Sequence, residues 1–220
     1  MRFFDILFSG IALLVLAPIL LIIILFLRLS GEGEIFFIQK RVGKEGKLFS
    51  LYKFATMLKN SEKIGTGTIT IKDDPRILPF GKFLRKTKLN ELPQLINVLI
   101  GDMSIIGPRP QAQRNFDAYG ENVRNNITLV RPGLSGIGSI IFRNEEEIMG
   151  NHNNSNKFYD EVIMPYKGDL ELWYIKNKSL FLYFYLIIST IIVILFSKNK
   201  FISMMYNDFP IPPEKLKKWI

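Results

Sequence analysis

Apolar residues gather near the two ends of the chain, and the stretch between them has the mixed composition of a globular domain. Residues Phe3 to Leu27 are almost wholly apolar, and as a helix they would extend ~37 Å, enough to cross a bilayer core of ~30 Å. Pro18 lies inside this run, where it removes a backbone hydrogen bond and clashes with the preceding turn. We therefore predict a membrane helix over residues 1–30 that bends near Pro18. Hydropathy alone leaves open whether the bent helix returns to the same face or spans.

A second apolar run, Leu180 to Phe196, would reach only ~25 Å as a helix, which is marginal for crossing. Basic residues lie on both sides of it, a pattern that favours an orientation with both ends on the cytoplasmic side over a span. Residues 180–220 are therefore predicted to form an apolar interfacial helix followed by a basic tail. The flanking lysines are Lys176, Lys178, Lys198 and Lys200.

The middle segment, residues 31–179, is predicted to be a mainly helical cytoplasmic domain with one small β-hairpin. Two β-prone runs, Glu34–Ile38 and Leu48–Tyr52, flank the turn-rich VGKEGK and form the hairpin. With the bent membrane helix and the interfacial amphipathic helices, the fold class is α+β. Helices are predicted over Leu78–Lys88, from the N-cap Asn90 to the terminator Gly101, over Ala112–Val130 and over Asn156–Ile163, with polar loops at Gly65–Lys72 and Asn151–Asn156.

The composition narrows the chemistry that the chain can perform. The 220 residues carry a formal net charge of +9, no cysteine and one histidine. Disulfides, thiol nucleophiles, histidine triads and Cys/His metal clusters are thereby excluded. A basic surface suits lipid headgroups, nucleotide diphosphates or nucleic acid. Catalysis would have to use carboxylates, Lys and Arg, hydroxyls and a hard cation.

The segment from Arg85 to Glu91 is the candidate site. A helix start offers free N–H groups to a phosphate, Arg85 can clamp a phosphate bidentately, and Glu91 can hold a divalent cation against a diphosphate. An ordinary capped helix explains the same residues without any function. Further candidates for phosphate binding, each of which can equally be a solvated surface charge, are Arg41, Lys53, Arg109, Arg131 and Arg143. The arginines in the rigid GPRP and RPGLSG settings strengthen the functional interpretation.

Five blocks of the sequence carry a recognisable pattern. Starting at Gln39, Tyr52, Asp74, Val130 and Tyr174, the blocks are QKRVG, YKFATM, DPRILPFGKFLRKTKLNELPQLINVLIGDMSIIGPRP, VRPGLSG and YIKNKSL. Together they resemble the bacterial sugar transferase family, the small monotopic phosphoglycosyl transferases that begin glycoconjugate assembly. The blocks occur in the family's order and span nearly the whole chain.

The resemblance implies a two-step, metal-dependent transfer at the cytoplasmic face of the bacterial inner membrane. A carboxylate would attack the β-phosphate of a UDP-sugar, UMP would leave, and undecaprenyl phosphate would accept the phosphosugar. It also implies a re-entrant helix bent at Pro18, Mg²⁺ as cofactor with Glu91 as its protein ligand, contact with membrane lipids, and a role in exopolysaccharide, O-antigen or capsule synthesis.

One departure from the family pattern affects the chemistry directly. The family's nucleophile is the Asp of an Asp-Glu pair, whereas this chain has Asn90-Glu91. Asn and Asp cap helices almost equally, but an amide carries no charge and is a poor nucleophile. Three hypotheses remain: Glu91 is the nucleophile, transfer is direct, or the chain is an inactive membrane binding or regulatory protein.

Two smaller departures concern specificity. Ile137, Gly138 and Ser139 stand where relatives often have Trp-Ala-Gln, and Tyr183 replaces an acidic residue, so no sugar is assigned. A membrane-anchored nucleic-acid-binding protein is a further hypothesis. It is disfavoured because no recognisable nucleic-acid-binding motif is present.

Overall fold

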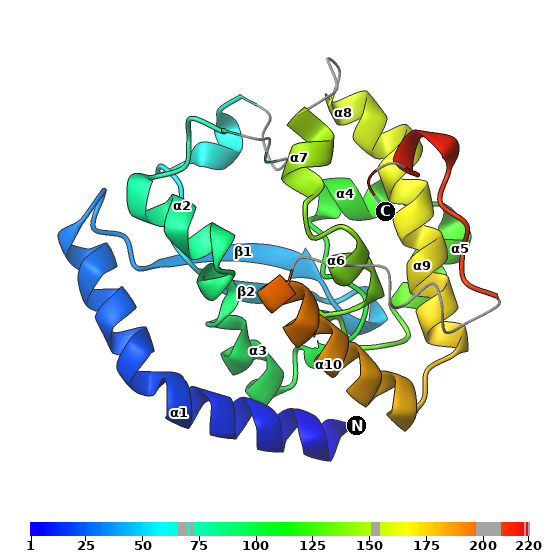
Figure 1. Ribbon diagram of the computed structural model, residues 1–220, viewed down its shortest axis with the longest axis horizontal. Helices are drawn as coiled ribbons and strands as arrows, with labels where there is room; N and C mark the ends of the chain where they lie inside the picture. The colour runs from blue at the N-terminus through cyan, green and yellow to red at the C-terminus, as the bar shows by residue number, and fades with distance from the viewer. Residues whose placement is uncertain (66–69, 71–72, 151–154, 197–207, 218, 220) are drawn as a thin grey trace.

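The computed structural model of the protein describes residues 1–65, 70, 73–150, 155–196, 208–217 and 219. In Figure 1, helix α1 borders the lower left of the molecule, a β-hairpin crosses the middle, and α9 lies at the right. The elements are α1 (Arg2–Leu29), β1 (Phe36–Val42), η1 (Lys44–Gly46), β2 (Leu48–Phe54), η2 (Ser61–Lys63), α2 (Pro79–Lys86), η3 (Leu89–Glu91), α3 (Gln94–Ile100), β3 (Ser104–Ile106), α4 (Gln113–Asp117), α5 (Glu121–Ile127), β4 (Gly133–Ser135), α6 (Ile137–Ile141), α7 (Glu145–Gly150), α8 (Ser155–Phe158), η4 (Tyr159–Ile163), α9 (Met164–Lys176), α10 (Leu180–Phe196) and η5 (Glu214–Leu216).

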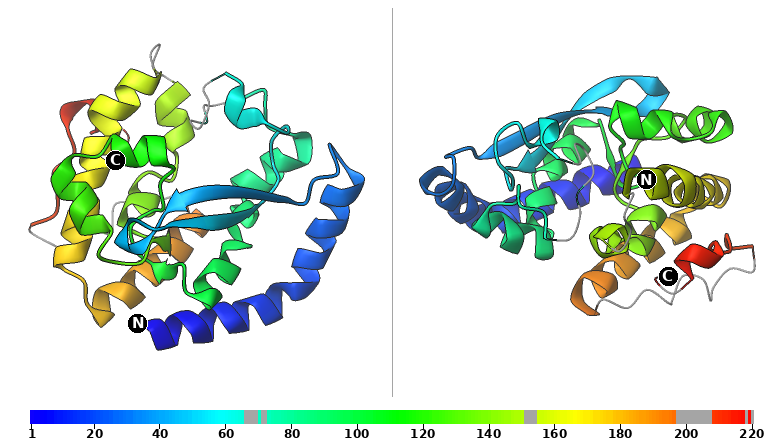
Figure 2. Two further views of the ribbon diagram at one scale, coloured as in Figure 1. Left: turned by 180° about the vertical axis from the view of Figure 1, so that it is seen from behind. Right: turned by 90° about the horizontal axis from the view of Figure 1, so that it is seen from above.

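Helix α1 is one element of 28 residues with Pro18 inside it. Figures 1 and 2 show that the helix bends in its middle part, as expected where a proline removes a backbone hydrogen bond. By length and composition it is long and apolar enough to cross a membrane. Many of its apolar side chains face away from the protein, and Leu14 is 79% exposed. The predicted bent apolar helix is confirmed.

The first turns of α1 carry polar side chains that fasten it to the rest of the protein. The Arg2 guanidinium donates to the carbonyl oxygens of Val98 and Leu99 at the end of α3. The buried Asp5 carboxylate accepts hydrogen bonds from the Ser104 hydroxyl and from the Tyr183 hydroxyl at 2.8–3.0 Å, and from a backbone N–H of β3. Backbone carbonyls at the C-terminal end of a helix lack intrahelical partners, and Arg2 supplies donors to two of those of α3.

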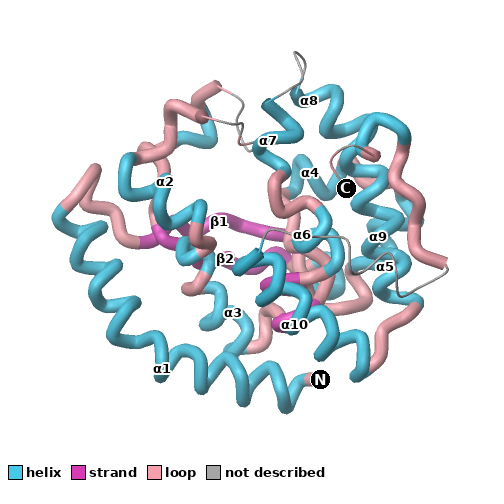
Figure 3. The backbone as a smooth tube through the Cα atoms, viewed as in Figure 1, coloured by secondary structure: helices cyan, strands magenta, loops and turns pink. Residues whose placement is uncertain are grey.

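The hairpin of β1 and β2 is antiparallel, with Phe36 opposite Phe54 and Val42 opposite Leu48. It therefore confirms the predicted hairpin with a first strand that starts later than expected. Helix α3 is attached to β2 through Asn97, whose side chain accepts from the Tyr52 N–H at 3.0 Å and donates to the Ser50 carbonyl at 2.8 Å. In Figure 3 the strands lie at the centre with helices around them.

The main core lies among α6, α9 and α10, where fully buried side chains include Ile137, Leu170 and Leu186. Strands β3 and β4 form a short parallel pair beside it. The backbone at Gly133 lies very close to the backbone at Gly107, just after β3. A Cβ at Gly133 would lie only 2.2 Å from the Gly107 nitrogen, so only glycine fits there. The close approach fixes where the chain leaves β3.

Three helix predictions are wrong in detail. Asn90 does not cap a helix: it lies in the 3₁₀ turn η3, and α3 begins at Gln94. The helix expected over Ala112–Val130 is split into α4 and α5, because Gly120 is extended with ψ of 154°. The helix expected over Asn156–Ile163 begins at Ser155 and continues through the π-helical turn η4 into α9.

Other predictions agree with the structure. Helix α2 lies within the predicted Leu78–Lys88, α10 has the predicted bounds, and Gly101 ends α3 with φ of 105°. The predicted loops Gly65–Lys72 and Asn151–Asn156 lie largely outside the described residues. The division into parts at residues 30 and 179 stays a prediction.

Candidate active site

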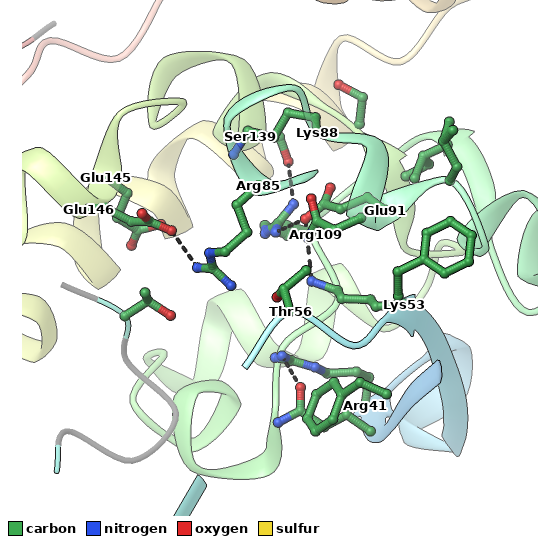
Figure 4. Close-up of a pocket in the computed structure, with 18 of the residues that line it drawn as sticks. Arg41, Lys53, Thr56, Arg85, Lys88, Glu91, Arg109, Ser139, Glu145 and Glu146 are labelled. Carbon is green, nitrogen blue, oxygen red and sulfur yellow. Dashed lines mark hydrogen bonds and ion pairs between the residues drawn. The ribbon is translucent and has the colours of Figure 1, made fainter. Parts of the chain in front are cut away.

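A cavity of about 690 Å³ lies between the hairpin, η3, the loop after β3, and helices α6, α7 and α10. Figure 4 shows basic side chains converging on it from several elements. Of the predicted site residues, those that line it are Arg41, Lys53, Arg85, Asn90, Glu91, Arg109 and Arg143. The fold therefore assembles one cationic site from positions that are far apart in the sequence.

Glu91 lies among these cations (Figure 4). Its Oε1 accepts a hydrogen bond from Arg109 Nη2 at 2.8 Å and pairs with Lys53 Nζ at 3.3 Å. Burial alone would raise the pKa of the Glu91 carboxyl, but Arg109, Lys53 and Lys88 hold this pKa well below its usual value. Lys88, in the left-handed conformation with φ of 61°, starts the turn that places Glu91 here. Glu91 is therefore a carboxylate at neutral pH.

Lys53 is the most perturbed of the cations. Burial lowers the pKa of its ammonium to about 7, and repulsion from Arg109 and Arg41 adds to this effect, although Glu91 opposes it. Burial also lowers the pKa of Lys88. Near pH 7 the site therefore changes its positive charge with small changes in pH, or on arrival of an anion.

Arg109 is positioned through its backbone as well as its side chain. Its N–H donates to Glu171 Oε1 at 3.3 Å, and its guanidinium approaches Ser139 Oγ at 3.5 Å. Glu171 is 2% exposed, burial raises its pKa to about 8, and its Oε2 has no hydrogen-bond partner among the described residues. The carboxyl occupies space left by Gly138, where a Cβ would lie 2.6 Å from Oε1. The departure at Gly138 thus leaves room for the group that holds Arg109.

The other predicted arginines differ in their surroundings. Arg85 pairs with Glu146 of α7, and Arg41 donates to Gln39. The Arg143 guanidinium donates to the Ile194 carbonyl of α10 at 3.4 Å. Arg131 does not line the cavity: it is exposed and donates to the carbonyl of Gly101. The structure therefore brings together all the predicted basic residues except Arg131.

Asn90 lines the cavity next to Glu91. It is 6% exposed, and its Oδ1 accepts no hydrogen bond from any described residue. A buried amide oxygen without a donor is costly. The position at which the resemblance places a nucleophile is thus occupied by a neutral oxygen that a ligand, a cation or water would satisfy.

Two charged residues near the site escaped the sequence analysis. These are Lys167 and Glu171; Lys167 is buried and pairs with Glu145 at 2.6 Å. Lys88 lies within the predicted segment Arg85 to Glu91, although no role was given to it. Lys167 and Glu171 lie one turn apart on α9, a helix that was not predicted beyond Ile163. Two opposite charges at i and i+4 were the available signal, but Asp169 and Lys176 on the same helix make this pattern resemble an exposed charged face.

The site offers few protein ligands for a metal. Among the described residues, no group of three or more His, Cys, Asp or Glu side chains is placed to hold a metal ion. Mg²⁺ commonly takes one or two carboxylates and completes its shell with water and ligand phosphates. Glu91 together with the unpartnered Asn90 oxygen fits this pattern only when a phosphorylated ligand supplies further oxygens.

An exposed apolar helix and a cavity lined by basic side chains are the features expected of a membrane-associated protein that acts on an anionic ligand. The chain belongs to the bacterial sugar transferase family, whose model matches residues 1–197. This confirms the resemblance drawn from the sequence.

Curated relatives cover different shares of the chain. The exopolysaccharide production protein ExoY of Sinorhizobium fredii is 35% identical over 158 residues, which are 66% of this chain and 70% of that protein. The UDP-N-acetylgalactosamine-undecaprenyl-phosphate N-acetylgalactosaminephosphotransferase of Aeromonas hydrophila is 35% identical over 88% of this chain and 43% of its own length. The undecaprenyl-phosphate galactose phosphotransferase of Salmonella typhimurium is 34% identical over 81% and 37%. The chain thus spans less than half the length of these two phosphotransferases.

Proposed function

We propose that the protein transfers a sugar-1-phosphate from a UDP-sugar to undecaprenyl phosphate and releases UMP, as the first membrane step in the synthesis of a bacterial polysaccharide or glycoconjugate. The reaction would take place at the cytoplasmic face of the inner membrane. The observation that carries the proposal is the ionised Glu91 held between Arg109 and Lys53 in a cavity lined by further cations. The names of the relatives support the acceptor and the donor class.

The cationic wall suits the charge of the reaction. A UDP-sugar carries a diphosphate, and preorganised cations offset charge that develops on the phosphoryl oxygens and on the leaving UMP. Arg109 and Lys53 share one carboxylate oxygen, so a diphosphate gives both cations a second anionic partner. When the two cations turn toward the diphosphate, Glu91 is released from them and can act on the donor. Mg²⁺, when bound by Glu91 and the diphosphate, would supply further positive charge.

Two routes lead to the same product. In the covalent route, a Glu91 oxygen attacks the β-phosphorus, the bond to the oxygen bridging the two phosphates breaks, and UMP leaves with the electron pair. An oxygen of undecaprenyl phosphate then attacks the same phosphorus and displaces Glu91. In the direct route, that oxygen attacks the donor itself, and Glu91 positions the diphosphate.

A second candidate function is a membrane binding or regulatory protein without turnover. Asn90 favours it, because this buried amide has neither the charge nor the nucleophilicity of the family Asp. Such a protein would bind a UDP-sugar and release no UMP.

UMP release from a panel of UDP-sugars, with undecaprenyl phosphate, Mg²⁺ and detergent, tests the proposal. We expect release with at least one sugar, and expect Asn90→Asp to preserve or increase it. In the covalent route, intact-mass measurement of the protein after incubation with the donor would detect a phosphosugar adduct, and peptide mapping would locate it on Glu91. Donor binding without release would support the second candidate. If no sugar gives either donor binding or UMP release, both candidate functions are contradicted.

A further inference from the structure

The cavity has an apolar wall as well as a cationic one. Helix α10 contributes to the lining a run of residues at helical spacing: Ile187, Thr190, Ile191, Val193 and Ile194. Ile105 of β3 and Leu134 of β4 also line the cavity. The diphosphate, ribose and sugar of a nucleotide sugar are polar and gain little from aliphatic side chains. This wall therefore suits an apolar part of a ligand of the reaction rather than the nucleotide sugar.

Polar contacts hold α10 against the cavity at two points. The Ser135 hydroxyl of β4 lies 2.8 Å from the Thr190 hydroxyl, which donates to the Leu186 carbonyl. One turn further on, the Arg143 guanidinium donates to the Ile194 carbonyl at 3.4 Å. A cation of the site thus lies directly beside the apolar wall.

A ligand that spans the junction at Arg143 must join an anionic group to a hydrocarbon. The outer face of α10 is itself apolar, with Phe181, Leu195 and Phe196 exposed by 63–67%. The wall inside the cavity is therefore continuous with a surface suited to lipid. A hydrocarbon chain that extends from a phosphate at Arg143 along α10 would therefore meet apolar side chains.

We propose that Ile187, Ile191 and Ile194 of α10 form the binding site for the phosphate-proximal isoprene units of the acceptor lipid, with Arg143 at the phosphate end. The inference rests on the proposed function, and it adds a place for the lipid chain. The methyl-branched isoprene units can make many dispersion contacts with the branched side chains of this wall.

A matched pair of isoleucines on α10 tests this assignment. Ile191 lines the cavity and is 53% exposed, whereas Ile188 is 56% exposed and does not line it. Both substitutions to Ser change the apolar surface of the helix equally, but only one changes the wall. We expect Ile191→Ser to raise the KM for undecaprenyl phosphate about five- to tenfold, the loss of one apolar side-chain contact, with the KM for the UDP-sugar unchanged. Ile188→Ser should leave both constants near wild type.

Equal effects of the two substitutions on the acceptor KM, or no effect of Ile191→Ser, would overturn the assignment. A second measurement does not depend on turnover: photolabelling of the wild-type protein with a farnesyl phosphate that carries a diazirine on its first isoprene unit. Labels on residues 187–194 support the site, and labels only elsewhere overturn it. Labelling of α10 without UMP release from any donor would contradict the proposed function but still support the lipid site.

Discussion

Asp5 and Glu91 are both carboxylates withdrawn from bulk solvent, and they differ in the partners that surround them. Asp5 on α1 accepts hydrogen bonds from two hydroxyls and one backbone N–H, all neutral donors. Glu91 in η3 faces Arg109 and Lys53, with Lys88 near enough to affect its pKa. Hydrogen bonds from neutral donors hold a carboxylate in one orientation. Cations around a carboxylate can in addition bind a second anion, such as a phosphate.

The difference indicates separate tasks for the two acids. Asp5 joins α1 to β3 and α10, so its removal should affect folding. Glu91 belongs to a charge cluster that lines the cavity, so its removal should affect chemistry. The two roles can be separated by comparing turnover with thermal stability in matched variants.

The largest effect is expected for Glu91→Gln. This substitution keeps the shape of the side chain and removes its charge, so kcat for UMP release should fall about 10³-fold or more, as when an essential catalytic group is removed. Thermal unfolding in detergent should change little, because the cavity can admit water and anions around Arg109 and Lys53. Turnover at the wild-type rate would remove Glu91 from the mechanism.

Asp5→Ala should have the opposite profile. It leaves the Ser104 hydroxyl, the Tyr183 hydroxyl and the Ile105 N–H without their acceptor, at a cost of about 3 kcal/mol or more in unfolding free energy. Tyr183→Phe removes one of the three donors and should cost about 1 kcal/mol. Differential scanning fluorimetry in detergent measures both. If Asp5→Ala unfolds like wild type and instead loses turnover, the structural role is wrong.

Gly138→Ala probes the support of Arg109. The added methyl would lie 2.6 Å from Glu171 Oε1, so the carboxyl must move away from the Arg109 N–H. We expect a loss of about 1–3 kcal/mol in stability and a rise of about tenfold in the KM for the UDP-sugar. Gly120→Ala is the matched control, because nothing lies within 4 Å of the Cβ position there and φ is −59°. A normal donor KM in Gly138→Ala would show that Arg109 does not depend on Glu171.

The smallest effect concerns pH. Since the pKa of Lys53 lies at about 7, the ammonium is charged below this value and neutral above it. The KM for the UDP-sugar should therefore rise about threefold between pH 6 and pH 8.5, a range in which the donor's diphosphate does not titrate. Lys53→Arg should give a flat profile, low throughout, and Lys53→Met a flat profile, high throughout. A wild-type slope that persists in both variants would assign the titration elsewhere.

The same shift has a consequence for stability. A lysine whose pKa is lower in the folded state binds fewer protons there than in the unfolded chain between about pH 7 and its ordinary value of 10.5. This residue's contribution to folding free energy therefore becomes more favourable as pH rises through that window. Thermal melts of wild type and Lys53→Met across the window isolate this contribution.

Long, uniform patterns in the sequence predicted most of the fold. Helices α1 and α10 and the hairpin follow from apolar runs, β-prone runs and a turn-rich connection. Predictions failed where a single residue or a tertiary contact decides: Gly120 divides one expected helix, and the 3₁₀ turn around Asn90 arises next to packed strands. Propensity is a weak guide wherever packing overrides it.

The candidate site could be assembled from the sequence only in part. Arginines in rigid Gly/Pro settings were good candidates, yet Arg109 reaches Glu91 and Arg131 instead donates to the Gly101 carbonyl. No local pattern distinguishes the two, because the partner of each side chain lies far away in the sequence, 18 positions for Arg109 and 30 for Arg131. Glu171 was missed for a related reason: the spacing of Lys167 and Glu171 was visible, but the importance of Glu171 comes from a backbone contact to Arg109.

The anchoring of Asp5 ties the order of synthesis to the order of assembly. Its carboxylate accepts from Tyr183, which lies 178 positions later in the chain. At 5–20 residues per second, a ribosome needs roughly 10–40 s to make the intervening segment. During that interval Asp5 lacks the Tyr183 hydroxyl as a donor, so this contact between α1 and α10 cannot form. The attachment of α1 to the rest of the protein is therefore complete only after α10, the last of the long helices, has been made.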